Sequence, residues 1–207
     1  MNSRGNILMA AFILLLAAAL GGCLPTAFTP EAGAAQAVVD QILPDFQVDP
    51  QSIEVTQSGP IGENVAVQVR FQGIRAAQGR EECLGVYEMH KTMFGGWTSG
   101  SGGTGCTSSR PPVDEMPFRA GQSTFSDGNP QNSASYAIAH GEIYNEDITH
   151  MLVTWNDGNT QQVEVVNRTF MAIRPGSIQA VNFDALDKNG EIVHSTSFGR
   201  ERAPGKQ

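Results

Sequence analysis

Asn64-Val65-Ala66-Val67-Gln68-Val69-Arg70-Phe71-Gln72 is the stretch that decides the fold, because apolar and polar side chains alternate along it. Successive side chains of a β-strand point to opposite faces. One face of this segment therefore carries Val65, Val67, Val69 and Phe71. The alternation predicts a half-buried strand, and with it a sheet that packs one face against a core.

Segments on both sides of this strand continue the period of two. They are residues 52–56, 83–91 and 93–98, and the last two lie close enough in sequence to form a hairpin near Lys91 to Gly96. We therefore expect an antiparallel sheet built from these segments together with the central strand.

A helix is predicted before the sheet, over residues 30–43. Thr29, Pro30 and Glu31 combine an N-cap candidate, a first-turn proline and an acidic residue that complements the helix dipole. Apolar residues then follow at helical spacing, at Ala34, Ala37, Val38, Ile42 and Leu43. Residues 30–106 are thus expected to form a small α+β domain, in which one helix covers one face of an antiparallel sheet.

Residues 107–133 are expected to be an interdomain linker. The Gly/Ser-rich segment 99–105 leads into it, and irregular sequence continues to about Ser133. These glycines do not join a strand to a helix as a phosphate-binding loop requires, so a flexible connection is favoured. The region is too long for a featureless loop inside one compact domain.

Residues 134–198 are predicted to form a β-sandwich. Short strands alternate there with turns at Asn156-Asp157-Gly158, Arg174-Pro175-Gly176 and Lys188-Asn189-Gly190. Met151, Val153 and Trp155 share one face of a strand and are expected to point into the core. The pattern resembles that of the small immunoglobulin-like (Ig-like) modules of exported bacterial proteins. The fold class is therefore predicted to be mainly β, and residues 199–207 to be a polar, frayed tail.

The N-terminus is predicted to be a signal for export. Arg4 precedes an uninterrupted apolar run of 14 residues from Ile7 to Leu20. That run is shorter than the approximately 20 residues of a membrane-spanning helix, and it has the length of the apolar region of a secretory signal. Residues 1–22 are thus expected to be removed.

Leu20-Gly21-Gly22-Cys23 resembles the lipobox of bacterial lipoproteins, in which an aliphatic residue and two small residues precede the lipidated cysteine. The resemblance implies that Cys23 becomes the acylated N-terminus, palmitate being one such acyl group. Residues 23–29 would then be a lipidated tether, and the protein would be anchored in the cell membrane or outer membrane, facing the periplasm or the exterior. The alternative is an ordinary signal peptide that has a cysteine near its cleavage site.

The chain has three cysteines, so lipidation of Cys23 would leave Cys83 and Cys106 as a pair. Two cysteines that remain unlipidated in an oxidising compartment predict a disulfide between them. A reactive thiol or a metal pair is the alternative, but the sequence has no Cys-x-x-Cys and no adjacent histidine cluster. The expected metal and cofactor content is therefore none.

Composition excludes some classes of function. A formal net charge of -8 argues against nucleic acid as a partner, because phosphate binding requires a basic surface. Common catalytic motifs such as Gly-x-Ser-x-Gly and His-Glu-x-x-His are missing from the sequence. We expect no catalytic residues and a protein that is not an enzyme. A histidine site assembled across the sandwich and a weak calcium site at residues 184–191 are alternatives that the sequence favours less.

The predicted function is that of a membrane-anchored, non-catalytic protein-interaction or assembly module with an extracytoplasmic protein partner. The alternative is an accessory lipoprotein that binds a glycan or small solute. Trp97 and Tyr87 are the candidate ligand contacts for that alternative, because exposed aromatic rings provide large stacking surfaces.

Overall fold

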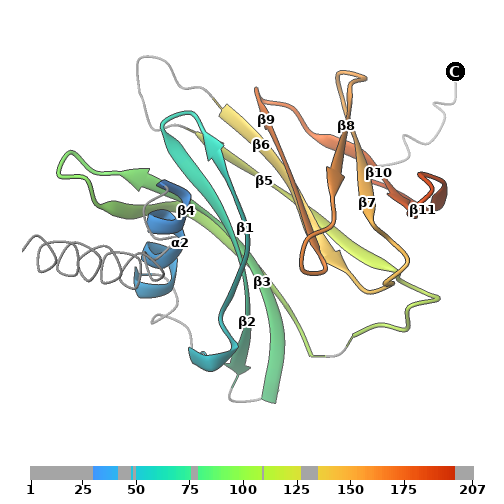
Figure 1. The fold of residues 1–207 in the computed structure, drawn as a ribbon, viewed down its shortest axis with the longest axis horizontal. Helices are drawn as coiled ribbons and strands as arrows, with labels where there is room; N and C mark the ends of the chain where they lie inside the picture. Colours follow the sequence, from blue (N-terminus) through green and yellow to red (C-terminus); the bar gives the residue numbers. More distant parts are fainter. Residues whose placement is uncertain are drawn as a thin grey trace, which may run out of the picture.

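A computed structural model describes residues 30–41, 48, 50–75, 79–108, 110–126 and 135–198. The described part is mainly β, which confirms the predicted fold class. Its strands form three antiparallel sheets, and one helix, α2 (Pro30–Gln41), covers the first of them (Figure 1). The predicted signal peptide, Cys23, the tether and the tail all lie outside the described residues.

The first sheet has the order β1-β2-β3-β4. Its strands are β1 (Glu54–Ile61), β2 (Asn64–Arg75), β3 (Gly79–Lys91) and β4 (Trp97–Thr107), and a short 3-10 turn, η3 (Pro50–Ser52), precedes them. Val65, Val67, Val69 and Phe71 on β2 point toward α2, where they pack with Ala34 and Val38 of the helix. The apolar face that the sequence predicted is therefore the face that the helix covers.

The second sheet, β5-β6-β9, and the third sheet, β11-β10-β7-β8, pack face to face as a sandwich. The strands are β5 (Phe118–Ser126), β6 (Ser135–Ile143), β7 (His150–Trp155), β8 (Thr160–Glu164), β9 (Thr169–Pro175), β10 (Ala180–Leu186) and β11 (Ile192–Ser197). Three strands thus face four across one core, as in Ig-like sandwiches. Met151, Val153 and Trp155 are all buried in that core, as predicted.

The second sheet is covered on both faces. Its outer face packs against the first sheet through a smaller core of Ile61, Ala66, Val86, Phe125, Ile138 and Met171. The molecule is consequently layered in the order helix, first sheet, second sheet, third sheet (Figure 1). The polar face of β2 is inside this stack: Gln68 is 0 % exposed, so the prediction of a half-buried strand was wrong.

The region predicted as a linker contains a strand. β5 lies within residues 107–133 and pairs with β6 along its whole length, from Phe118 opposite Ile143 to Ser126 opposite Ser135. The Gly/Ser-rich segment before it is also ordered, because residues 99–107 belong to β4 and pair with β3. Residues 93–95, which the sequence assigned to a strand, form the turn of the β3–β4 hairpin instead.

Candidate functional site

A buried polar cluster lies between the first and second sheets. At its centre is Glu142 on β6, which is 3 % exposed. Its carboxylate lies 3.6 Å from Arg70 Nε on β2 and 3.8 Å from Arg119 Nη2 on β5. The Tyr144 hydroxyl donates a hydrogen bond of 3.2 Å to the same carboxylate. Glu142 thus joins the second sheet to the first through Arg70, while Arg119 comes from the neighbouring strand of its own sheet.

Arg70 also fixes the turn that leads into β9. Its Nη2 donates to the backbone carbonyl of Asn167 at 2.8 Å, and its Nη1 lies 3.2 Å from Glu54. Asn167 and Arg168 both have positive φ, at 49° and 58°, which is a costly conformation for residues that are not glycine. The arginine therefore holds a strained turn of the sandwich from the neighbouring sheet.

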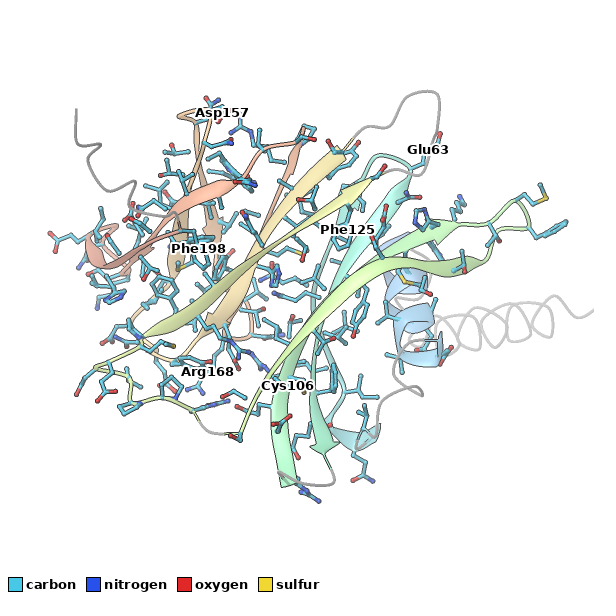
Figure 2. All side chains as sticks on the ribbon, turned by 180° about the vertical axis from the view of Figure 1, so that it is seen from behind. Glu63, Cys106, Phe125, Asp157, Arg168 and Phe198 are labelled. Atoms are coloured by element: carbon cyan, nitrogen blue, oxygen red, sulfur yellow. A yellow bond between two sulfur atoms is a disulfide. The ribbon has the colours of Figure 1, made fainter. Side chains whose placement is uncertain are left out.

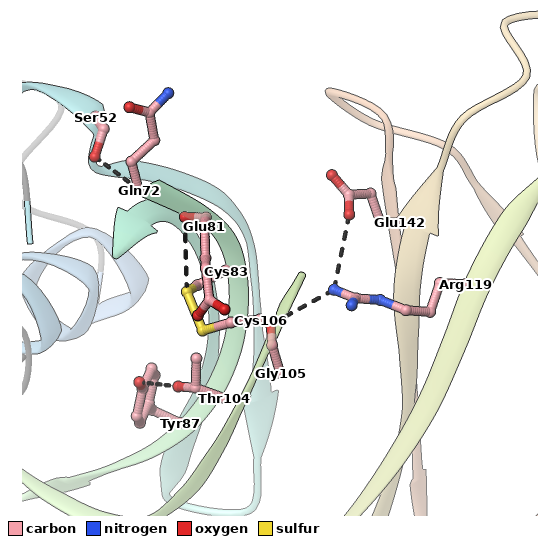
Figure 3. Close-up of a disulfide and its surroundings, with 10 residues drawn as sticks. All are labelled: Ser52, Gln72, Glu81, Cys83, Tyr87, Thr104, Gly105, Cys106, Arg119 and Glu142. Atoms are coloured by element: carbon pink, nitrogen blue, oxygen red, sulfur yellow. Dashed lines mark hydrogen bonds and ion pairs between the residues drawn. A yellow bond between two sulfur atoms is a disulfide. The ribbon is translucent and has the colours of Figure 1, made fainter. Parts of the chain in front are cut away.

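A cleft opens beside this cluster, where β4 of the first sheet faces β5 of the second. We call it the inter-sheet cleft. Its volume is about 200 Å³, and it is lined by Leu84, Gly105, Arg119, Ala120, Gly121, His140 and Gly141. Arg119 spans it, since Nη2 also donates a long hydrogen bond of 3.5 Å to the Gly105 carbonyl (Figure 3). The cleft is smaller than the roughly 300–1,000 Å³ of typical small-molecule sites.

His140 is the titratable base in the wall of the inter-sheet cleft. Its Nε2 lies 3.4 Å from Ser123 Oγ, while Nδ1 is buried and has no hydrogen-bond partner. Burial, assisted by the positive charge of Arg119, lowers the pKa of His140 from 6.5 to about 4. The imidazole is therefore neutral at neutral pH.

The shift makes the stability of the fold depend on pH. The folded state resists protonation of His140 while the unfolded state accepts it, so stability is fully present above pH 6.5 and is lost as the pH falls toward 4. Between about pH 7.5 and about pH 4.5 the His140 contribution should lower the free energy of unfolding by about 2 to 3 kcal/mol. Urea unfolding of the wild type and of His140→Gln at both pH values measures it.

The control for this prediction is His194→Gln, on β11 of the third sheet. Its pH dependence should follow that of the wild type, whereas His140→Gln should lose the part that His140 supplies. Equal pH dependence in all three proteins would contradict the assignment to His140.

Two glycines of β4 have no steric reason to be glycine: Gly105, which lines the cleft, and Gly103, which precedes it by two residues on the same face of the strand. A Cβ added at Gly103 or Gly105 would meet no atom within 4 Å, and neither residue has a positive φ. The contrast with Gly102 is clear, because a Cβ there would lie 2.3 Å from the Tyr87 ring. Glycine inside a strand often marks a place where another backbone or a ligand approaches closely. The empty space beside Gly103 and Gly105 thus has the character of a contact surface.

The predicted disulfide is present. Cys83 on β3 and Cys106 on β4 are bonded directly across the strand pair, with Cα atoms 4.1 Å apart (Figure 3). It closes the β3–β4 hairpin, and a loop of this size is stabilised by about 3 kcal/mol on the chain-entropy model. The bond holds the Gly-rich strand, which has almost no side chains with which to pack.

The two candidate ligand aromatics lie on the helix side of the first sheet, away from the inter-sheet cleft. Tyr87 is 6 % exposed and shares a hydrogen bond with the Thr104 hydroxyl. Burial raises the pKa of its phenol, and the Thr104 bond opposes part of that rise. Trp97 is half-buried against the same core, with its indole beside Gly33 of α2. The structure therefore does not bring them together as an open stacking surface.

Sequence reasoning did not find the cluster or the cleft. Glu142, Arg119 and His140 lie on the second sheet, and the sequence pattern did not indicate that the first sheet covers its outer face. One signal that could have found them is the alternation of small and polar residues in Ala139-His140-Gly141-Glu142. Such a strand fits an interface between two sheets better than a free surface.

Within the described ranges, no helix is long and apolar enough to cross a membrane. The same residues contain no group of three or more His, Cys, Asp or Glu side chains with the geometry to hold a metal ion. Comparison with protein-family models, with curated proteins and with solved structures finds no significant match.

Proposed function

We propose that the protein is a lipid-anchored extracytoplasmic module that binds an extended segment of a partner protein in the inter-sheet cleft, along β4. The observation that carries the proposal is the open glycine backbone of β4, at Gly105 in the lining of the cleft and at Gly103 two residues before it. β4 is also an edge strand, so one side of its backbone is free of strand pairing within the described sheets. Extended peptides bind such edges through main-chain hydrogen bonds.

The size and chemistry of the cleft favour a peptide over a free solute. At about 200 Å³ it has room for one or two side chains of a segment lying along the strand. Its walls offer apolar contacts at Leu84 and Ala120 and polar contacts at Arg119 and His140. A partner carbonyl or carboxylate would find a donor in Arg119, whose ion-pair partner Glu142 is 3.8 Å away.

The anchor part of the proposal is supported by the lipobox-like sequence that ends at Cys23. In bacteria that express the chain, the wild type should fractionate with membranes and take up labelled palmitate. Cys23→Ser should lose the label and be released, because the sulfur that receives the lipid is gone. Retention of Cys23→Ser in the membrane fraction would mean instead that the apolar run is an uncleaved anchor.

The binding part is tested by filling the cleft. Gly105→Val adds a side chain where the structure has space, and valine suits a strand, so the melting temperature should hold. A photo-crosslinking residue at 103 should capture one dominant extracytoplasmic protein, and Gly105→Val should reduce that product at least about tenfold, a loss equivalent to about 1.4 kcal/mol of binding.

The matched control places the crosslinker at Gln162, which is exposed on β8, an edge strand of the third sheet. It should give no comparable product. Equal crosslinking from both positions, or crosslinking at 103 that Gly105→Val leaves unchanged, would contradict binding in the cleft.

A further inference from the structure

The tip of the β3–β4 hairpin carries the two most exposed large apolar side chains of the described residues. Met93 is 89 % exposed and Phe94 is 92 % exposed. Figure 2 shows the hairpin extending beyond the rest of the body, past the β1–β2 turn that carries Glu63. Met93 and Phe94 are adjacent, and apolar side chains that are exposed together are a feature of surfaces that contact a partner or a membrane.

The turn that presents them is well formed. Thr92 N donates to Gly96 O at 2.8 Å, Gly95 N donates to Thr92 O at 3.0 Å, and Gly96 N donates to the Thr92 hydroxyl at 3.0 Å. Gly95 takes a φ of 82°, which glycine adopts without strain. The backbone of the turn therefore fixes both apolar side chains on the outside.

The apolar surface is confined to the tip. The arm of β4 next to it, Ser99-Gly100-Ser101, is exposed and presents only hydroxyls and backbone. Residues 91–107 include Lys91 and no Asp or Glu, although the whole chain has 21 acids. Lys91 and Glu63 both lie beside Met93, so their charges offset each other, and the two apolar side chains suit shallow insertion between lipid head groups. The same area is small for a stable protein interface.

The position of the tip is the second argument. Trp97, the first residue of β4 after the hairpin turn, lies against the first turn of α2, where a Cβ on Gly33 would be 2.9 Å from the indole nitrogen. Phe94 is three residues from Trp97, so the tip lies within about 10 Å of that contact. α2 begins at Pro30, and the seven residues from Cys23 to Pro30 span at most about 25 Å. A lipid on Cys23 would hold this end of the molecule at the bilayer.

We infer that Met93 and Phe94 insert into the lipid surface to which the protein is anchored, as a second membrane contact that orients the module. The inference rests on the proposed lipid anchor at Cys23. It places β4 and the inter-sheet cleft at a fixed angle to the membrane, whereas a tether alone would let them rotate.

The test uses the full chain, lipidated in bacteria and reconstituted in vesicles of phosphatidylethanolamine and phosphatidylglycerol. Phe94→Cys is labelled with an environment-sensitive fluorophore, and nitroxide-bearing lipids serve as quenchers. Cys83 and Cys106 are bonded to each other, so the new thiol is the one that reacts. The control is Lys188→Cys, exposed in the β10–β11 turn, which lies at the opposite end of the molecule from the hairpin (Figure 1).

The label at 94 should shift to the blue and be quenched severalfold more strongly than the label at 188. Mass spectrometry of the N-terminal peptide reports lipidation independently. A lipidated protein with equal quenching at 94 and 188 would overturn the insertion and leave the anchor standing. A protein without lipid on Cys23 would overturn the anchor, and this inference with it. A crosslink from residue 94 to a protein, without quenching, would show that a protein covers the tip and would also overturn insertion.

Discussion

Glu142→Ala should lower the free energy of unfolding by about 3–5 kcal/mol, the cost typical of removing one partner from a buried ion pair. The carboxylate is 3 % exposed and lies between Arg70 and Arg119. Without it, two guanidinium groups face each other across the interface of the first and second sheets with no negative charge between them. The hydrogen bond that Tyr144 donates would be lost as well. Chemical denaturation with a fitted m-value measures the change.

Asp157→Ala is the control, because it removes a surface ion pair whose N–O distances are shorter than those at Glu142. Asp157 contacts Arg174 through two hydrogen bonds of 2.7 and 2.9 Å, against ion-pair distances of 3.6 and 3.8 Å at Glu142. If distance governed stability, Asp157→Ala would be the more damaging change. We expect the reverse, because solvent screens the exposed pair. Equal losses in the two variants would contradict a structural role for the buried cluster.

Glu142→Gln separates charge from packing. The amide keeps the shape of the side chain and can accept from Tyr144, but it cannot neutralise the arginines. Its loss of stability should fall between those of the wild type and Glu142→Ala. An intermediate loss would mean that both the charge and the shape of Glu142 help to hold the first sheet against the second.

The elements that the sequence predicted well are those whose two faces differ. β2 has valines on one face and polar groups on the other, and β7 has the same contrast with Met151, Val153 and Trp155. The turn chemistry of Asn156-Asp157-Gly158 and Lys188-Asn189-Gly190 also placed the hairpins correctly, with positive φ at Gly158 and Gly190. The local pattern locates a strand where its two faces differ in polarity, but it does not show what covers the polar face. That face is partly exposed on β7, whereas on β2 it packs inside the stack.

β5 was missed because it breaks that rule. Phe118 packs toward the third sheet while Phe125 packs toward the first, so its two large apolar residues lie on opposite faces. Between them Arg119 pairs with Glu142 of the neighbouring strand β6 and donates to the Gly105 carbonyl of the first sheet. A strand that is covered on both sides and contributes to a polar interface has no clear period of two.

β4 was missed for a different reason. Ser99-Gly-Ser-Gly-Gly-Thr-Gly105 has low strand propensity, and pairing with β3 together with the Cys83–Cys106 bond holds it in the sheet. Tertiary context thus overrides composition in this segment. The site is hard to predict for the same reason, because it lies where β4 and β5, the two strands without a local signal, face each other across the cleft.

Phe170→Ala should also cost about 3–5 kcal/mol of stability, as large-to-small changes of buried aromatics do. Phe170 is 0 % exposed on β9, its ring centroid lies 5.9 Å from that of Phe183, and a Cβ on Gly141 would be 2.4 Å from its ring. Gly141 therefore leaves room for this ring. The tightly packed residues around the ring have little freedom to move into the cavity that alanine would leave.

The matched control is Phe94→Ala at the hairpin tip, which removes the same atoms from a side chain that is 92 % exposed and should change stability by no more than about 0.5 kcal/mol. Thermal and chemical denaturation of the two variants compare the same chemical change inside and outside the core, and similar losses would mean that the tip is held by contacts within the fold. If Phe94→Ala leaves stability intact, then the exposed ring contributes nothing to the fold and is available for a contact outside the folded chain.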